Sequence, residues 1–520
     1  MSQVKTQPFD PLDVSNYSLE KLPEIKGSVW MDRVKFIGLP LGIFSFLYFY
    51  LQWCGQIEVF EVQSKVPPAH CYAALGIFVS SLILWLTEAI PNYLTSFLII
   101  VATILTGIMN MRPTFAILGE PVMVLNIASF IMASALMVTG LAKRICLYLV
   151  LAMGKNVTHI LACFIAINIL LGAFVSATSA KTALLLPLFM VISAMYGSTG
   201  SENRNNVGRN MVLQNLLANN VSASAFITGS AANLLAAQLL ENAGYKVYYS
   251  DWLMALLPLS IIQCAFAWYT GTRWIFPIRK EDASPKLEGG HERLRQELSK
   301  LGPVTGKELR AGIVFLCVLI LWATDRYHGI RAEVVALMGA ITVLMPSVCK
   351  LPRIGVIKWN DADIPWHMLM FSWGAYVLGG LVDKTDIVGL WMHYSLDSWN
   401  AASMSKLSVF AILATLFALT TLISESKTAR TIVLFPIIIS VAKNFNWDVI
   451  GFCLPMGFLI NQVYVLYFNS KPANISYLTN QYSSWESFKF GIIQMSACLI
   501  MLILWTQYVM PIMGFNSKLW

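Results

Sequence analysis

Two short segments place basic side chains inside long apolar stretches of the chain. The segment SKTARTIVLFP, residues 426–436, carries Lys427 and Arg430, and the segment ATSAKTALLLP, residues 177–187, carries Lys181. In a bilayer, a cation at mid-depth costs about 2.5–3.5 kcal/mol even on the most lenient insertion scale, so such residues are usually functional. The chemistry that suits buried cations is the binding of an anion.

A simpler interpretation is that Lys427 and Arg430 lie at a loop edge and extend to lipid headgroups. Alignment of the two segments argues against it, because Arg430 matches Lys181 and Pro436 matches Pro187. The cations are also predicted just inside the start of a helix that runs toward the proline. A helix N-terminus already carries about half a positive charge, so further cations there are unfavourable until an anion arrives.

The composition explains the apolar surroundings. The 520 residues are 57% hydrophobic and 12% charged, with a mean hydropathy of +0.64; soluble domains carry about 25% charged residues. The sequence therefore predicts an all-α membrane protein, with spans of roughly 20 residues each. Uninterrupted spans are expected at 36–53, 71–90, 92–109, 122–142, 252–276, 309–324, 331–348, 366–383 and 487–511. Small and polar residues interrupt the apolar regions 157–196, 211–240, 405–441 and 446–480. Together these give about eleven crossings plus two re-entrant helical hairpins.

Charge asymmetry predicts the orientation. Basic residues precede the first span, and no cleavable signal peptide is expected before it. The N-terminus is therefore expected on the cytoplasmic side of the cell membrane and the C-terminus outside. The polar segment 279–308 is expected to be a cytoplasmic linker between two halves. The predicted units are 1–35 (N-terminal segment), 36–145 (scaffold), 146–278 (hairpin and broken helix), 279–308 (linker), 309–400 (scaffold) and 401–520 (second hairpin and broken helix).

Each half contains a second polar break after its hairpin. The segment TGSAANLL, residues 228–235, follows the first hairpin, and NSKPANIS, residues 469–476, follows the second at a similar interval. This correspondence pairs Asn233 with Asn474. Two copies with an odd number of crossings would lie in opposite orientations, which is the inverted-repeat plan of secondary transporters with a site at the midplane.

With these motifs, the chain resembles the divalent anion:sodium symporter family of dicarboxylate and citrate carriers. That family has a Ser-Asn-Thr motif at each hairpin tip and a Gly-Thr-Pro-Pro-Asn-like break after it. The segments WLTEAIP (85–91), LGPVTGKELR (301–310) and ADIPWHMLMFSWGAYVLGG (362–380) are similar to family landmarks, and the resemblance spans about residues 70–510. It implies a homodimer with a scaffold and an elevator-type moving transport domain, and an anion held by both tips and both breaks.

The chain departs from the family pattern at the tips. The first tip reads ATSAK at 177–181 and the second SKTAR at 426–430, so both asparagines are replaced and three cations are present. Sodium requires oxygen ligands, whereas lysine and arginine offer only donors. We therefore expect an anion exchanger that does not depend on sodium. The family resemblance implies that its substrates are dicarboxylates such as 2-oxoglutarate, malate, fumarate and succinate. The expected substrate-binding residues are Ser179, Lys181, Thr182, Thr228, Ser230, Asn233, Ser426, Lys427, Thr428, Arg430, Ser470 and Asn474.

Other functions fit less well. An enzyme would need a catalytic arrangement, and no Ser–His–Asp set or metal-ligand spacing stands out, so no metal or cofactor is expected. An anion channel could use cation rings but would not need two broken repeats. No basic face stands apart from the spans, which disfavours nucleic acid as a partner. Within the carrier class, the alternative is a sodium- or proton-coupled di- or tricarboxylate symporter, with Glu425 as a candidate proton carrier. Citrate and sulfate also remain open as substrates.

Overall fold

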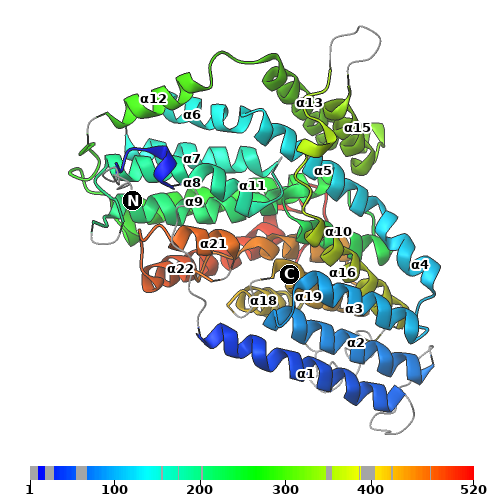
Figure 1. The fold of residues 1–520 in the computed structure, drawn as a ribbon. Helices are drawn as coiled ribbons and strands as arrows, with labels where there is room; N and C mark the ends of the chain where they lie inside the picture. Colours follow the sequence, from blue (N-terminus) through cyan, green and yellow to red (C-terminus); the bar gives the residue numbers. More distant parts are fainter. Residues whose placement is uncertain are drawn as a thin grey trace, which may run out of the picture.

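The computed structural model describes residues 10–17, 29–53, 67–153, 156–173, 175–200, 203–287, 289–346, 354–385, 387, 404–422, 426–468 and 470–520. Every regular element in these ranges is a helix, as predicted (Figure 1). Glu425 and Asn469 lie outside the described residues. The first half contains η1 (Val14–Tyr17), α1 (Val29–Trp53), α2 (Pro68–Thr87), α3 (Asn92–Leu105), α4 (Met111–Ala116), η3 (Ile117–Gly119), α5 (Pro121–Val138), α6 (Leu141–Met153), α7 (Val157–Gly172), α8 (Thr178–Met195), α9 (Asn206–Ala225), η4 (Ile227–Gly229), α10 (Ala231–Asn242), α11 (Tyr249–Thr270) and η5 (Gly271–Ile275).

The second half follows a linker helix, α12 (Gly290–Lys300), and from α18 onward its elements come in the same order as those from α7 to η5. It contains α13 (Gly306–Ala323), α14 (Asp325–His328), α15 (Ala332–Leu344), η6 (Trp359–Asp361), α16 (Trp366–Thr385), α18 (Lys406–Thr420), α19 (Lys427–Asn444), α20 (Val449–Met456), η8 (Gly457–Asn461), α21 (Lys471–Tyr477), α22 (Ser484–Leu504) and η9 (Trp505–Val509).

Several helices have the length and composition of membrane spans. Among the described residues, six helical stretches qualify: Arg33–Gln52, Pro68–Thr87, Met111–Val138, Thr178–Met195, Tyr249–Ile275 and Ser484–Val509. Shorter apolar helices add Asn92–Leu105, Val157–Gly172, Ala332–Leu344, Lys406–Thr420 and Val449–Asn461. On α1, large apolar side chains such as Phe36 and Phe44 are exposed rather than buried. Lipid is the solvent that such a surface requires.

Each region predicted as a hairpin contains two successive helices, α7 then α8 in the first and α18 then α19 in the second. Both predicted broken helices form as well, as α9–η4–α10 and α20–η8–α21. In the first break, a Cβ at Gly229 would lie 2.3 Å from the carbonyl oxygen of Ala223, so only glycine lets the chain turn this close to α9. Ser230 and Ser470 then cap the helices that restart, each accepting a hydrogen bond from a backbone N–H in the first turn.

The linker helix α12 is fastened to α6, its neighbour at one end of the molecule (Figure 1). Lys143 on α6 pairs with Glu297 on α12 at 2.9 Å, and Arg144 pairs with Glu308 at 2.9 Å. Burial alone would raise the pKa of the Glu297 carboxyl, but hydrogen bonds from Lys300 and Lys143 hold this pKa below its ordinary value. The linker is thus charged and held at a defined place.

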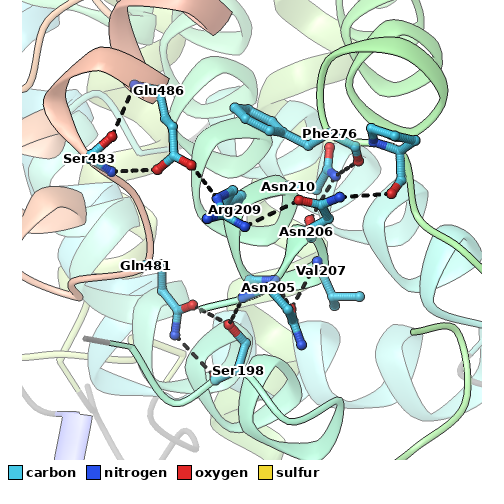
Figure 2. Close-up of polar contacts among 12 residues, drawn as sticks. Ser198, Asn205, Asn206, Val207, Arg209, Asn210, Phe276, Gln481, Ser483 and Glu486 are labelled. Atoms are coloured by element: carbon cyan, nitrogen blue, oxygen red, sulfur yellow. Dashed lines mark hydrogen bonds and ion pairs between the residues drawn. The ribbon is translucent and has the colours of Figure 1, made fainter. Parts of the chain in front are cut away.

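Helix α9 lies at the centre of the helices around the two breaks. It packs against α7, α8 and α11 of its own half and against η8 and α21 of the other half. Figure 2 shows how the beginning of α9 is tied to the start of α22: Arg209 donates to Glu486 at 2.6 Å. Nearby, Ser198 donates to Gln481 at 2.6 Å and also accepts from the backbone N–H of Asn205, which caps α9. The two halves are therefore joined by polar contacts around α9 as well as by apolar packing.

Candidate functional site

The two hairpin tips have the same local geometry. Helix α8 begins at Thr178 after Ala177, and α19 begins at Lys427 after Ser426, with nearly identical backbone angles at the two capping residues (φ −80, ψ 100 and φ −80, ψ 105). Each helix carries its proline further along, at Pro187 and Pro436. The alignment of the two segments by sequence is confirmed at the level of structure.

The paired cations of the tips make equivalent contacts. Lys181 is fully buried, and its Nζ donates to the carbonyl oxygen of Asn219 and to Ser222 Oγ, both at 3.1 Å. Arg430, 1% exposed, donates from Nη2 to the carbonyl oxygen of Ile460 at 2.9 Å. In both halves the tip cation therefore reaches the helical segment that precedes the break, α9 in the first and η8 in the second.

Lys427 connects the two halves. Its Nζ donates to Asn220 Oδ1 at 2.9 Å and lies 3.5 Å from Thr178 Oγ1, so a side chain of the second tip contacts both α9 and the first tip. It is also within electrostatic reach of Lys181 and Arg430. The three cations predicted from the sequence are thus brought to one place between the repeats.

Among the described residues, no carboxylate forms an ion pair with these cations. None of the ion pairs between described residues includes Lys181, Lys427 or Arg430. Within the described part of the chain, Nε and Nη1 of Arg430 are buried and have no acceptor. A buried guanidinium with unused donors is costly unless a partner arrives, and its planar fork suits a carboxylate or another oxyanion.

The hydroxyl and amide side chains of the breaks make different kinds of hydrogen bond. Thr228 lies 3.0 Å from the Tyr249 hydroxyl, whereas Ser230 and Ser470 are the helix caps described above. Asn233 is fully buried; its Nδ2 donates to the carbonyls of Ala223 and Phe226, and its Oδ1 accepts from Asn461 at 2.8 Å.

The repeats correspond slightly differently here than the sequence indicated. Measured from the capping serines, Asn233 is the third residue of α10, whereas Asn474 is the fourth residue of α21. The pairing of Asn233 with Asn474 is therefore shifted by one residue. The shift has a visible effect, because Asn474 is only half-buried while Asn233 is inside the protein.

The remaining predicted residues lie on the tips. Thr182 accepts a hydrogen bond from Asn219 Nδ2 at 2.6 Å and belongs to the contacts around Lys181. Ser426 caps α19 and accepts from the backbone N–H of Ala429. Ser179 is half-buried and lies two residues before Lys181, and Thr428 is buried and directly follows Lys427. The two tips and the first break thus meet through direct contacts, and Ser470 and Asn474 lie on the second break.

Sequence reasoning missed the C-terminal third of α9 and the end of η8. Asn219, Asn220 and Ser222 hold the lysines, and Asn461 links the two breaks. A signal was present in the segment NLLANNVSAS, residues 215–224, because amides and serines are unusually dense there for an apolar helix. Among the described residues, no cluster of three or more His, Cys, Asp or Glu could hold a metal ion.

The family described as the transmembrane region of sodium:sulfate symporters matches residues 59–515 of the chain. The chain belongs to this sodium:sulfate symporter family. Membership makes the protein a multi-pass membrane transporter of small anions rather than an enzyme, and it confirms the resemblance to divalent anion:sodium symporters at the level of the family.

Individual relatives of this transporter cover most of its length. A membrane protein of Cupriavidus necator is 27% identical over 442 residues, covering 80% of this chain and 83% of the relative. The sodium-dependent dicarboxylate transporter SdcS of Staphylococcus saprophyticus is 24% identical over 464 residues, covering 85% and 88%. The structure of the Alcanivorax borkumensis YdaH transporter aligns with 78% of this chain and 90% of its own, with 11% identity and a TM-score of 0.47.

Proposed function

We propose that this transporter exchanges dicarboxylates across the cell membrane without sodium. The observation that carries the proposal is the group of Lys181, Lys427 and Arg430 between the two repeats, which has no carboxylate partner among the described residues. Lys181 and Arg430 are buried, and Lys427 is half-buried. The dicarboxylate class is taken from relatives such as SdcS, whose name gives that substrate. Candidate substrates are 2-oxoglutarate, malate, fumarate and succinate, and the anion is held by the tips and breaks.

The contacts of Lys181 support independence from sodium. A carbonyl oxygen and a hydroxyl oxygen surround its Nζ, and these are the ligands a hard cation such as sodium would take. An ammonium group on the chain occupies that place and supplies the positive charge permanently. The same reasoning applies to Arg430, whose guanidinium takes the carbonyl oxygen of Ile460.

Obligate exchange follows because the positive charges of the site belong to side chains and cannot be released with the substrate. We propose an elevator-type cycle in which the hairpins and broken helices (146–278 and 401–520) move past scaffold helices (36–145 and 309–400) of a homodimer. With the site empty, this motion would carry uncompensated cations past apolar surface, and desolvating even one costs several kcal/mol. An added barrier of about 4 kcal/mol slows the empty return roughly a thousandfold. A bound dianion cancels most of the charge, so the loaded carrier moves.

A second candidate is a sodium- or proton-coupled symporter of the same anions. The observation that favours it is the name of SdcS, a relative that is sodium-dependent. The orientation that we propose, with the N-terminus cytoplasmic and the C-terminus outside, is the same for both candidates. They differ in what must accompany the anion.

Uptake into proteoliposomes distinguishes the exchanger from the coupled symporter. Liposomes filled with malate should take up labelled 2-oxoglutarate rapidly, and empty liposomes should take up almost none, with valinomycin and equal potassium preventing a membrane potential. Equal initial rates in filled and empty liposomes would rule out obligate exchange. Uptake into empty liposomes that appears only with an inward sodium or proton gradient would establish the symporter. Citrate and sulfate as competitors test the substrate class.

A further inference from the structure

Tyr249, the first residue of α11, lies outside the predicted site but contacts its first break. Its hydroxyl is 3.0 Å from Thr228 Oγ1, and either atom could be the donor. Both residues are almost completely buried, so the contact is protected from water. The direction of this hydrogen bond decides what Thr228 can offer to an anion.

A threonine hydroxyl has one proton and two lone pairs. If Thr228 donates to Tyr249, the proton of Thr228 is used in that bond. Only its oxygen lone pairs can then face a substrate, and these repel a carboxylate. If Tyr249 donates, the proton of Thr228 is free to point at an anion. A phenol is the more acidic of the two hydroxyls and hence the better donor, which favours donation by Tyr249.

The tyrosine ring is held in position independently of Thr228. It stacks on Trp322 of α13, with 4.7 Å between ring centroids and 21° between the planes. Trp322 is itself fixed, because its Nε1 donates to the carbonyl oxygen of Ala332 at 3.0 Å. The backbone N–H of Tyr249 donates to Asp325 Oδ2 at 2.8 Å, and the Ser250 hydroxyl donates to Asp325 Oδ1 at 2.6 Å.

Two ion pairs strengthen the attachment of this region. Arg326 pairs with Asp251 at 2.5 Å, and Arg331 pairs with Glu241 at the end of α10 at 2.6 Å. The connector between α13 and α15 is therefore paired with α10, which follows the first break, and with α11, which carries Tyr249. A hydroxyl held this rigidly can orient its partner at little further entropic cost.

From this geometry we infer that Tyr249 is a positioning residue for substrate binding: it donates to Thr228 and so directs the Thr228 proton toward the bound anion. The inference rests on the proposed function in taking Thr228 as an anion ligand. It adds a residue from outside both tips and both breaks to the binding machinery.

The test compares Y249F with Y196F. Both variants keep a buried ring, but the Tyr196 hydroxyl, at the far end of α8 from Lys181, has no hydrogen-bond partner within the described residues. We expect Y249F to weaken substrate affinity roughly two- to tenfold, the contribution of one neutral hydrogen bond, without changing the maximal exchange rate. Y196F should match the wild type in both quantities.

Variants of Thr228, combined with Y249F in a double-mutant cycle, give the decisive test. T228V, which keeps the shape but removes the hydroxyl, should weaken affinity, and adding Y249F to it should cause no further loss. T228S, which keeps the hydroxyl, should restore most of the affinity and the sensitivity to Y249F. The inference is overturned if Y249F behaves like Y196F, or if the effects of T228V and Y249F multiply as independent effects do.

Substrate affinity is measured in two ways, so that failure of the exchange mechanism can be distinguished from failure of the inference about Tyr249. Malate, 2-oxoglutarate, citrate and sulfate are titrated against the thermal unfolding of the purified protein in detergent, and KM and maximal rate are measured in proteoliposomes. Stabilisation by an anion without obligate exchange would defeat the exchanger but leave the Tyr249 comparison readable from the titration midpoints. If no anion stabilises the wild type, both proposals fall.

Discussion

Lys181 and Arg430 occupy the same place in two helices that are far apart in the sequence. Each is the fourth residue of its hairpin helix, and each donates to a main-chain carbonyl just before the break of its own repeat, at 3.1 Å to Asn219 and 2.9 Å to Ile460. The repeats thus differ in residue type but not in the role of the cation. Lys427, which has no basic counterpart in the first repeat, then crosses to Asn220.

Neutral replacement of Arg430 should weaken substrate binding strongly. Hydrogen bonds to charged groups contribute about 1.5–3 kcal/mol, so R430A should lose roughly 10- to 150-fold in affinity. R430K keeps the charge but loses the planar fork and should fall between R430A and the wild type. Exchange assays and gel filtration measure activity and folding, and K443A, at the exposed end of the same helix, is the control. Normal affinity in R430A would remove this residue from the site.

Replacing sodium by choline should leave the exchange rate of the wild type unchanged. The reason is that ammonium and guanidinium groups already occupy the oxygen ligands that sodium would use. The measurement is the initial rate of labelled uptake into malate-filled liposomes over a range of sodium concentrations. An uptake rate that rises steeply with sodium concentration would contradict the prediction and favour a sodium-coupled mechanism.

Removal of the Lys181 side chain should create a need for a free cation. In K181A, the carbonyl oxygen of Asn219 and Ser222 Oγ lose the ammonium group that they hold in the wild type. Sodium, or ammonium and methylammonium ions, should then restore part of the exchange activity. Uptake by K181A is compared across these salts with choline as the reference. Wild-type rates must stay flat in the same series, and a variant that no cation rescues would contradict the replacement of sodium by lysine.

The Asn233–Asn461 contact should stabilise the junction between the repeats. N233A leaves the buried carbonyls of Ala223 and Phe226 and the Asn461 amide without their partner, at a cost of about 1–3 kcal/mol. N461A should destabilise less, and the double variant should be more stable than the sum of the two predicts. Thermal unfolding in detergent measures this coupling. N474A, at a half-buried position, should leave the unfolding temperature nearly unchanged; equal losses in N233A and N474A would argue against a junction role.

Much of the fold could be predicted because a membrane helix can be recognised from the hydropathy of its own residues. A run of apolar residues with Pro187 or Pro436 downstream and small residues upstream was enough to place the starts of α8 and α19. The same local logic found the breaks around Ser230 and Ser470, because a polar gap in an apolar stretch must be accommodated inside the protein. The register within a break was harder to predict, since the cap that restarts the helix fixes it, and the pairing of Asn233 with Asn474 was shifted by one residue for that reason.

The sequence by itself therefore determined that three cations lie within membrane-embedded segments and that two of them are repeat-related. Only the tertiary structure decided what they touch. Lys427 meets Asn220 across 207 residues of chain, and Asn233 meets Asn461 across 228. The physical reason is that hydropathy fixes which segments leave water, whereas the partner of a buried polar group depends on which helices pack together and at what rotation. In this chain α9 packs between the two repeats, and its amide-rich segment meets both lysines.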